Sequence, residues 1–213
     1  MNQEFDYGWK SENSSHSHNY YLPAILSMLP SPISPRGEKL KVLDLGCGNG
    51  SLTSKIAEKG FDVTGIEESE SGVKIASQNY PNCSFFVGSV YELKYKEQSL
   101  ENAFDIIISS DVIEHLFFPR KLIEAAKICL KPQGKLLVTT PYHGYWKNLA
   151  LAMSGKLDQH FTVLWDGGHI KFFSVKTLTE LLKEEGFTDI QFNFVGRLPY
   201  LWKGMLSIAT INK

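Results

Sequence analysis

The sequence predicts an α/β protein whose doubly wound, mostly parallel sheet has seven strands and ends in an antiparallel pair. Short apolar runs alternate with helical patterns through the first 140 or so residues. A glycine cluster closes the first of these runs, and two late β-rich runs are joined by a link too short for a helix. This alternation requires right-handed crossovers, which place helices on both faces of the sheet.

The first elements are predicted from apolar spacing. Residues 40–45 (LKVLDL) form a short apolar run that indicates a buried parallel strand. Helical spacing follows over 51–59, and 61–66 is the second strand. A second helix is expected over 69–79, with Ser69 as its N-cap.

The middle of the chain continues the alternation of strands and helices. Residues 84–87 and 103–109 are the third and fourth strands, and the Ile triplet of the latter favours a strand because it is β-branched. A helix is expected over 119–130, where the opening proline suits a first turn. Residues 131–134 predict a turn, and 135–140 the fifth strand.

The last third departs from the alternation. Residues 142–169 are rich in aromatics, His and Gly and show no obvious strand. A helix is expected over 174–185, followed by the antiparallel strands 189–195 and 205–211. Near the start, the Ser/His/Asn-rich residues 11–19 predict a mobile lead-in.

Length and charge narrow the class of protein. The 213 residues suit one domain, or one domain with a small appendage, and the net charge of -1 offers no basic excess for binding a nucleic acid. Three cysteines without a CxxC pair argue against a disulfide framework. No secretory signal and no apolar run of roughly 18 residues is seen, so a cytoplasmic protein without membrane insertion is expected.

The strongest motif is VLDLGCGNG, residues 42–50, which places three glycines between a strand and a helix. Glycine lets the backbone approach a ligand closely, because it has no Cβ. A dinucleotide fingerprint, G-x-G-x-x-G, would need glycine where Ser51 stands. Glu67 ends the next strand, about 20 residues after the glycine cluster. A carboxylate at this position can accept hydrogen bonds from both hydroxyls of a ribose. A nicotinamide-dependent oxidoreductase therefore becomes the weaker alternative.

At these residues the sequence resembles the class I S-adenosylmethionine-dependent methyltransferases, over roughly residues 39–211. The resemblance implies a Rossmann-like fold and S-adenosylmethionine as cofactor. It places Gly46, Gly48 and Gly50 under the cofactor, Asp44 near its amino group and Glu67 on its ribose hydroxyls.

The resemblance extends to three further cofactor residues. Ser89 stands where the family commonly has an acid that reaches the adenine, and Val90 follows it; Ser110 is assigned to the methionine end. SSDVIEHL, residues 109–116, matches the family motif after the fourth strand. The ending TTPYHGYW…GGHIKFFS…LLKEEGF is similar to the ubiquinone-biosynthesis O-methyltransferase branch.

Two histidines are the candidate catalytic residues. A sulfonium methyl is electrophilic, so the protein has to align an acceptor and remove its proton where needed. His143 directly follows the fifth strand, at the edge where ligands bind in such folds, and is the first candidate for the base; His115 is the second. The alternative is that His143 only shapes the pocket.

The D-x-x-E-H spacing of Asp111, Glu114 and His115 leaves a metal site open. His143 or His169 would complete it, since a divalent ion takes oxygen and nitrogen donors. The alternative is that Glu114 and His115 tie the loop to the following helix. This second interpretation is favoured, so no metal is expected.

The expected organisation is a lead-in and helix over 1–36, acting as a lid on the acceptor site, and a cofactor-binding domain over 37–213. A second lid is expected near 142–172, because its aromatics fall outside the sheet. A dimer interface or a shallow membrane patch is the alternative. The expected function is methyl transfer to an oxygen, or less readily a nitrogen, of a small-molecule acceptor. A cofactor-binding module without turnover, and a homodimer, stay open.

Overall fold

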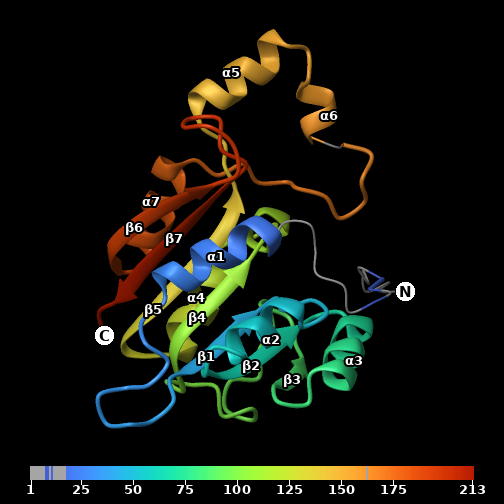
Figure 1. The fold of residues 1–213 in the computed structure, drawn as a ribbon. Coiled ribbons are helices and arrows are strands. Elements are labelled where there is room, and N and C mark those ends of the chain that lie inside the picture. Colours follow the sequence, from blue (N-terminus) through green and yellow to red (C-terminus); the bar gives the residue numbers. More distant parts are fainter. Residues whose placement is uncertain (1–7, 10, 12–17, 162) are drawn as a thin grey trace.

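The computed structural model describes residues 8, 9, 11, 18–161 and 163–213 of the chain. Its seven strands form one sheet in the order β3-β2-β1-β4-β5-β7-β6, as drawn in Figure 1. The strands are β1 (Lys41–Leu45), β2 (Asp62–Glu67), β3 (Ser84–Val87), β4 (Phe104–Ser110), β5 (Leu130–Pro141), β6 (Phe187–Val195) and β7 (Gly204–Ile211). Strands β1 to β5 pair in parallel, whereas β7 pairs antiparallel with both β5 and β6. The predicted sheet is confirmed.

The order of the strands reverses beside β1. From β1 the chain first builds outward through β2 to β3, and then returns to lay β4 on the other side of β1. In doubly wound sheets such a reversal opens a crevice at the carboxyl ends of the two central strands. A ligand site is therefore expected where β1 and β4 end.

Helices cover both faces of this sheet (Figure 1). The core divides into two clusters, because successive side chains of a strand point to opposite faces. Ile107 packs with α4 and α7 on one face, whereas Ile106 and Ile108 pack with α1 and α2 on the other. The helices are α1 (His18–Met28), α2 (Ser51–Ala57), α3 (Glu70–Asn79), α4 (Arg120–Cys129), α5 (Tyr145–Met153), α6 (Leu157–Phe161) and α7 (Val175–Glu184), with a short 3-10 turn, η1 (Ile113–His115).

The predicted helix limits hold where caps define them. Ser69 accepts a hydrogen bond from the Gly72 N–H at the start of α3, as predicted. Ser174 begins α7 with a capping box that Thr177 completes. Pro119 precedes α4 rather than standing inside its first turn. These ends depend on local chemistry, which the sequence carries.

One region differs from the expectation. The turn predicted over 131–134 lies inside β5, where Gln133 has a φ of 63° and the register against β4 shifts. As expected, no strand lies among the described residues of 142–169; this region contains α5 and α6, which project beyond the sheet in Figure 1. The lead-in predicted over 11–19 lies mostly outside the described residues. Within the described part of the chain, no helix is both long and apolar enough to cross a bilayer.

Candidate active site

A cavity of about 470 Å³ opens at the carboxyl edge of the sheet, where β1 and β4 end. Its wall combines the loop after β1, the end of β2, the loop after β4 and two segments outside the sheet. The lining residues are Trp9, His18, Tyr20, Gly46, Cys47, Gly48, Glu67, Glu68, Gly88, Val90, Ser110, Asp111, Val112, His115, Leu116, Pro141, Trp165 and His169. The cavity therefore lies at the reversal of strand order.

The three predicted glycines have different surroundings. All have positive φ values, which favour glycine, but only Gly46 and Gly48 line the cavity. A Cβ on Gly50 would lie 2.7 Å from the Cβ of Ala76 and 2.9 Å from the ring of Phe85. Gly50 thus allows the loop to pack against α3 and β3, and its contribution to a ligand site is indirect.

Glu67 is buried at the end of β2 and lines the cavity. Its Oε2 accepts from the Gly48 N–H at 2.9 Å, and its Oε1 accepts from the Ser69 N–H at 3.0 Å. Burial raises the pKa of this carboxyl, while backbone hydrogen bonds from Ser69, Gly48 and Glu68 oppose the rise. A carboxylate has about four acceptor positions, so two amide donors leave room for a ligand diol.

Asp44 lies beneath the glycine loop and is 1% exposed, so it does not line the cavity. Its Oδ2 accepts from the Thr53 hydroxyl at 2.6 Å, whereas its Oδ1 has no hydrogen-bond partner among the described residues. Burial raises the pKa of Asp44 to about 7. An unmatched buried oxygen of this kind suits a cationic group bound above the loop.

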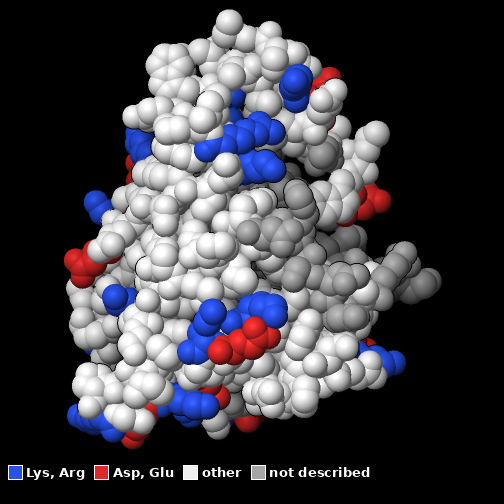
Figure 2. Space-filling view, in the orientation of Figure 1, with Lys and Arg blue, Asp and Glu red and all other residues white. Residues whose placement is uncertain are grey.

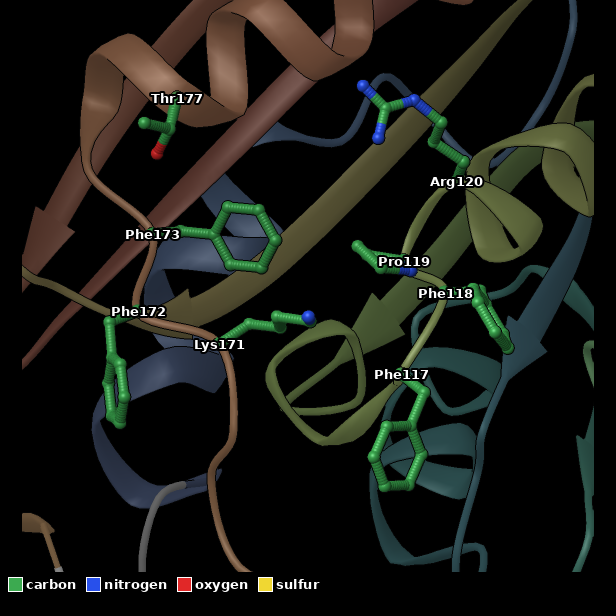
Figure 3. Close-up of a pocket in the computed structure, with 8 residues that line it drawn as sticks. All are labelled: Phe117, Phe118, Pro119, Arg120, Lys171, Phe172, Phe173 and Thr177. Carbon is green, nitrogen blue, oxygen red and sulfur yellow. The ribbon is translucent and has the colours of Figure 1, made fainter.

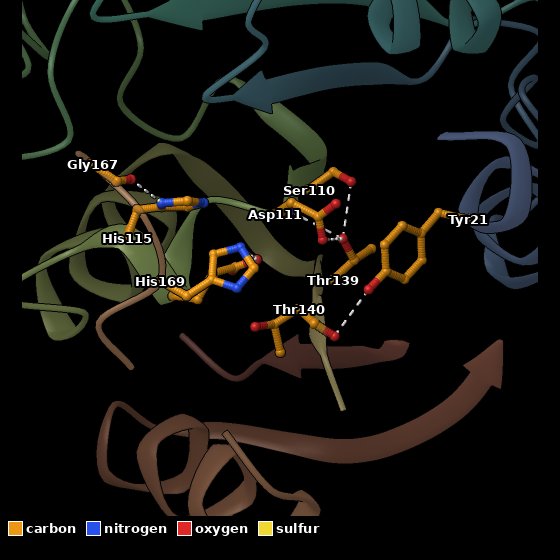
Figure 4. A network of polar contacts seen from close by, with 9 residues as sticks. Tyr21, Ser110, Asp111, His115, Thr139, Thr140, Gly167 and His169 are labelled. Carbon is orange, nitrogen blue, oxygen red and sulfur yellow. Dashed lines mark hydrogen bonds and ion pairs between the residues drawn. The ribbon is translucent and has the colours of Figure 1, made fainter. Parts of the chain in front are cut away.

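The remaining predicted cofactor residues fall into two groups. Val90 and Ser110 line the cavity, whereas Ser89 does not. The Ser110 hydroxyl lies 2.9 Å from Thr139 Oγ1 on β5 (Figure 4). Asp111 follows with a φ of 54°, and its N–H donates to the same Thr139 oxygen at 3.1 Å. These bonds fix the loop after β4.

His115 and His169 also line the cavity. Their ring centroids lie 4.8 Å apart (Figure 4). The His115 Nδ1 lies 2.7 Å from the carbonyl oxygen of Gly167 and must donate, since a carbonyl only accepts. Burial lowers the pKa of His115 below its ordinary 6.5 and that of His169 to about 4. Both imidazoles are therefore neutral at neutral pH and able to accept a proton.

Glu114 stands directly behind these histidines. Its side chain is 0% exposed, and neither carboxyl oxygen has a hydrogen-bond partner in the described structure. The His169 Nε2 lies 4.0 Å from Glu114 Oε1. Burial raises the pKa of Glu114 well above its ordinary value, and the nearby Asp111 adds to the rise.

These three residues form the group with metal-ligand spacing. Glu114, His115 and His169 each bring one ligand atom within 4.8 Å of the others. Of the set weighed from the sequence, Asp111 instead bonds Thr139 and His143 lies elsewhere. The structure thus favours His169 over His143 as the third donor of this group.

His143 is not at the cavity. It is 7% exposed, and its ring contacts the rings of His160, Phe161 and Phe172, which come from α6 and the segment before α7. Burial, with Lys147 and His160 nearby, lowers its pKa to about 4. The structure therefore places this predicted base in an aromatic cluster, away from the residues predicted to bind the cofactor.

A second pocket, of about 360 Å³, lies on the surface (Figure 3). It shares no lining residue with the cavity and carries exposed aromatics next to two cations. Its lining residues are Phe117, Phe118, Pro119, Arg120, Lys171, Phe172, Phe173 and Thr177. Figure 2 shows a separate group of Lys and Arg near the link between β6 and β7, while most of that face is uncharged.

The family is decided by the match of residues 15–191 to the family described as a methyltransferase domain. The chain belongs to this family. The predicted membership of the class I S-adenosylmethionine-dependent methyltransferases is therefore confirmed. S-adenosylmethionine is confirmed as the cofactor.

Individual relatives cover part of this methyltransferase domain. The chain is 34% identical over 131 residues to the ubiquinone biosynthesis O-methyltransferase of Caulobacter vibrioides. This match covers 60% of this chain and 50% of that protein. The chain is 35% identical over 108 residues to the mitochondrial enzyme of that name from Mus musculus, covering 47% and 28%. The chain thus spans half the length, or less, of these two relatives.

Solved structures share the fold. A protein from Pyrococcus horikoshii superposes with a TM-score of 0.71 at 20% identity, over 96% of this chain and 95% of that one. The magnesium protoporphyrin IX methyltransferase from Synechocystis, solved with S-adenosylhomocysteine bound, gives 0.64 at 18% identity, over 90% and 80%. At these identities the likeness concerns the fold alone.

The cavity of the methyltransferase domain fits a nucleoside cofactor. Gly46 and Gly48 line it, and Glu67 offers a carboxylate beside Gly48. Trp9, Tyr20 and Trp165 belong to the aromatic residues outside the sheet from which a lid is predicted, and all three line the cavity. The sequence does not distinguish them from Tyr145 and Trp146, which do not line it.

Proposed function

We propose that this methyltransferase domain transfers a methyl group from S-adenosylmethionine to an oxygen of a small-molecule acceptor. The observation that carries the proposal is the shared cavity between β1 and β4. The carboxylate of Glu67, which is placed to bind a ribose, lines this cavity together with two neutral histidines, His115 and His169. Cofactor and acceptor would thus meet in one enclosed space. The O-methyltransferase names of the two relatives support oxygen over nitrogen.

The cofactor end would use the residues around the glycine loop. Glu67 would accept from the ribose hydroxyls, and Gly46 and Gly48 would let the backbone approach. Val90 and Ser110 would line the same end, whereas Ser89, Asp44 and Gly50 would act from outside the cavity wall. The bound cofactor supplies an electrophilic methyl group on a sulfonium.

The acceptor end would use His115 as the base. Its Nδ1–H is held by the Gly167 carbonyl, so its Nε2 is the nitrogen that takes up the acceptor's proton. His143 was the first candidate from the sequence. Its burial among aromatic rings, outside the cavity lining, favours a structural role for it.

Both predicted lid segments contribute to the cavity wall. Trp9, His18 and Tyr20 come from the N-terminal 1–36, and Trp165 and His169 come from 142–172. We propose that both segments shield the reacting groups from water, because large rings bury much area. In contrast, Tyr145 of α5 is 74% exposed, so this helix lies outside the shield.

Binding and transfer can be tested separately. Calorimetry should show binding of S-adenosylhomocysteine and no binding of NAD. Transfer of a labelled methyl group from the cofactor to a panel of phenols, carboxylates and amines should then mark a phenolic or other hydroxyl acceptor. Binding without transfer to any compound would favour the module without turnover, and NAD binding would favour the oxidoreductase.

A second candidate chemistry is a metal-assisted form of the same transfer. Glu114, His115 and His169 have the spacing for one ion, and the Glu114 carboxyl is fully buried. An ion there would orient and acidify the acceptor hydroxyl. Dialysis against EDTA separates the two forms: the base mechanism keeps its rate, whereas the metal form loses it and regains it with Mg²⁺ or Mn²⁺.

A further inference from the structure

Trp9 lies in a slot made by two glycines. A Cβ on Gly48 would lie 2.6 Å from Trp9 Cζ2, and one on Gly72 would lie 2.9 Å from Trp9 Cδ1. The Cγ of Glu67 is 3.2 Å from the same Gly72 position. The indole therefore packs between the glycine loop and the start of α3, next to the predicted ribose carboxylate, and it lines the cavity.

Neighbouring contacts hold this part of the chain on the loop. The buried Asn49 side chain donates from Nδ2 to the carbonyl oxygen of Ser11 at 2.8 Å. At the start of α1, the His18 Nδ1 lies 3.1 Å from the Ser51 hydroxyl. Asn49 of the glycine loop and Ser51 directly after it thus contact Ser11 and His18, which flank Trp9 on its C-terminal side. These two hydrogen bonds add to the packing of the indole itself.

The indole N–H lacks an acceptor. Trp9 Nε1 is buried and has no hydrogen-bond partner among the residues described. A buried indole N–H usually finds a partner, and it can only donate. An unmatched donor at the wall of a ligand cavity, next to Glu67, indicates a missing acceptor atom, and a nucleoside offers several oxygen and nitrogen acceptors.

We infer that Trp9 is a cofactor-binding residue. Its indole bounds the nucleoside end of the cofactor, and its Nε1–H donates to an acceptor atom of that nucleoside. This inference rests on the proposed function and goes beyond it, because the N-terminal segment was expected to cover the acceptor. It means that the N-terminal segment and the glycine loop bind the cofactor together.

The test is S-adenosylhomocysteine binding by calorimetry in W9F and W9A, with W146F as the matched control. Trp146 lies on α5, is 60% exposed and does not line the cavity. W9F keeps a ring and loses the N–H, so binding should weaken about 2- to 12-fold. W9A also loses the packed ring and should weaken on the order of 10- to 100-fold. W146F should match the unmodified chain.

A second readout is tryptophan fluorescence. The emission change on S-adenosylhomocysteine binding should be reduced in W9F and retained in W146F. Equal affinity in all variants would overturn the inference and make Trp9 a packing residue. Tighter binding by W9A would also overturn it, because Trp9 would then be a plug that the cofactor displaces. Failure of the unmodified chain to bind would instead refute the proposed function.

Discussion

The Glu67 carboxylate accepts a hydrogen bond from the Gly48 backbone N–H at 2.9 Å. This bond joins the end of β2 to the loop after β1, so one side chain both shapes the glycine loop and faces the cavity. The glycine loop and the acid proposed to bind the cofactor's ribose are therefore a single structural unit rather than two independent features.

Glu67→Gln should weaken S-adenosylhomocysteine binding by about 1.5–3 kcal/mol, because a charged acceptor is replaced by a neutral amide. Calorimetry measures the change. The control is Glu70→Gln, an exposed acid in the first turn of α3 that does not line the cavity. If both variants bind like the unmodified chain, Glu67 has no part in ribose binding.

Asp44→Asn should change how stability depends on pH. Burial raises the pKa of Asp44 from 3.8 to about 7, so the folded chain holds a proton that the unfolded chain has released. The contribution of protonated Asp44 to the free energy of unfolding is full below pH about 4 and is lost as the pH rises through 7. An asparagine side chain does not titrate. As the pH rises from about 4 to 7, the free energy of unfolding of the variant should therefore increase relative to that of the unmodified chain, by up to about 1.4 kcal/mol per pH unit.

Urea unfolding of both chains between pH 4.5 and 7.5 measures this difference. The Thr53 hydroxyl can still donate to the amide oxygen of the substituted side chain, so the existing bond at this position is kept. A difference in unfolding free energy that stays constant across the range would show that Asp44 is ionised throughout.

His115→Gln should lower kcat by about 10²–10⁴-fold while S-adenosylhomocysteine affinity stays the same, because only proton transfer is lost. Burial lowers the pKa of His115 below 6.5, so activity should be retained as the pH falls to 6.5 and lost only below it. The acid limb of kcat/KM should be absent in the variant.

His143→Phe is the matched comparison, since a second aromatic ring fits the cluster with Phe161 and Phe172. Turnover should stay within a few-fold of the unmodified chain, provided that cofactor affinity confirms folding. A loss as large as that of His115→Gln, with folding intact, would return the role of base to His143.

Tyr21→Phe should lower the free energy of unfolding by about 0.5–1.5 kcal/mol. The Tyr21 side chain is 1% exposed, and its hydroxyl donates to the Thr140 carbonyl at 3.0 Å, which fastens α1 to β5 (Figure 4). Tyr145→Phe, at a position 74% exposed, should change stability by less than about 0.5 kcal/mol. Denaturant unfolding measures both changes. If the two variants lose the same free energy of unfolding, the Tyr21–Thr140 hydrogen bond does not contribute to stability.

The sheet could be predicted because its signals are local. The β-branched run at Ile106–Ile108 and the short link before β7 need no knowledge of distant residues. The same holds for the glycine loop and Glu67, which adjacent parallel strands bring together. These parts of the site lie where strands end, and strand ends can be read from the sequence.

His143 shows why the rest could not be predicted. Its place after β5 puts it at the carboxyl edge of the sheet, but α6 and the segment before α7 fold over it and bury its ring. Trp9 is the opposite case, since nothing near it in the sequence places its indole against Gly48. Both outcomes depend on packing between distant segments, which leaves no periodicity in the sequence.

Strand β7 is the last strand in the sequence, yet it is an interior strand of the sheet. It pairs with β5 on one side and β6 on the other, and seven of its eight residues are buried. During synthesis, β5 therefore leaves the ribosome with one edge unpaired until the final strand follows. Unpaired strand edges are the surfaces through which chains aggregate. A chain truncated before Gly204 should accumulate in inclusion bodies, however complete its cofactor loop is.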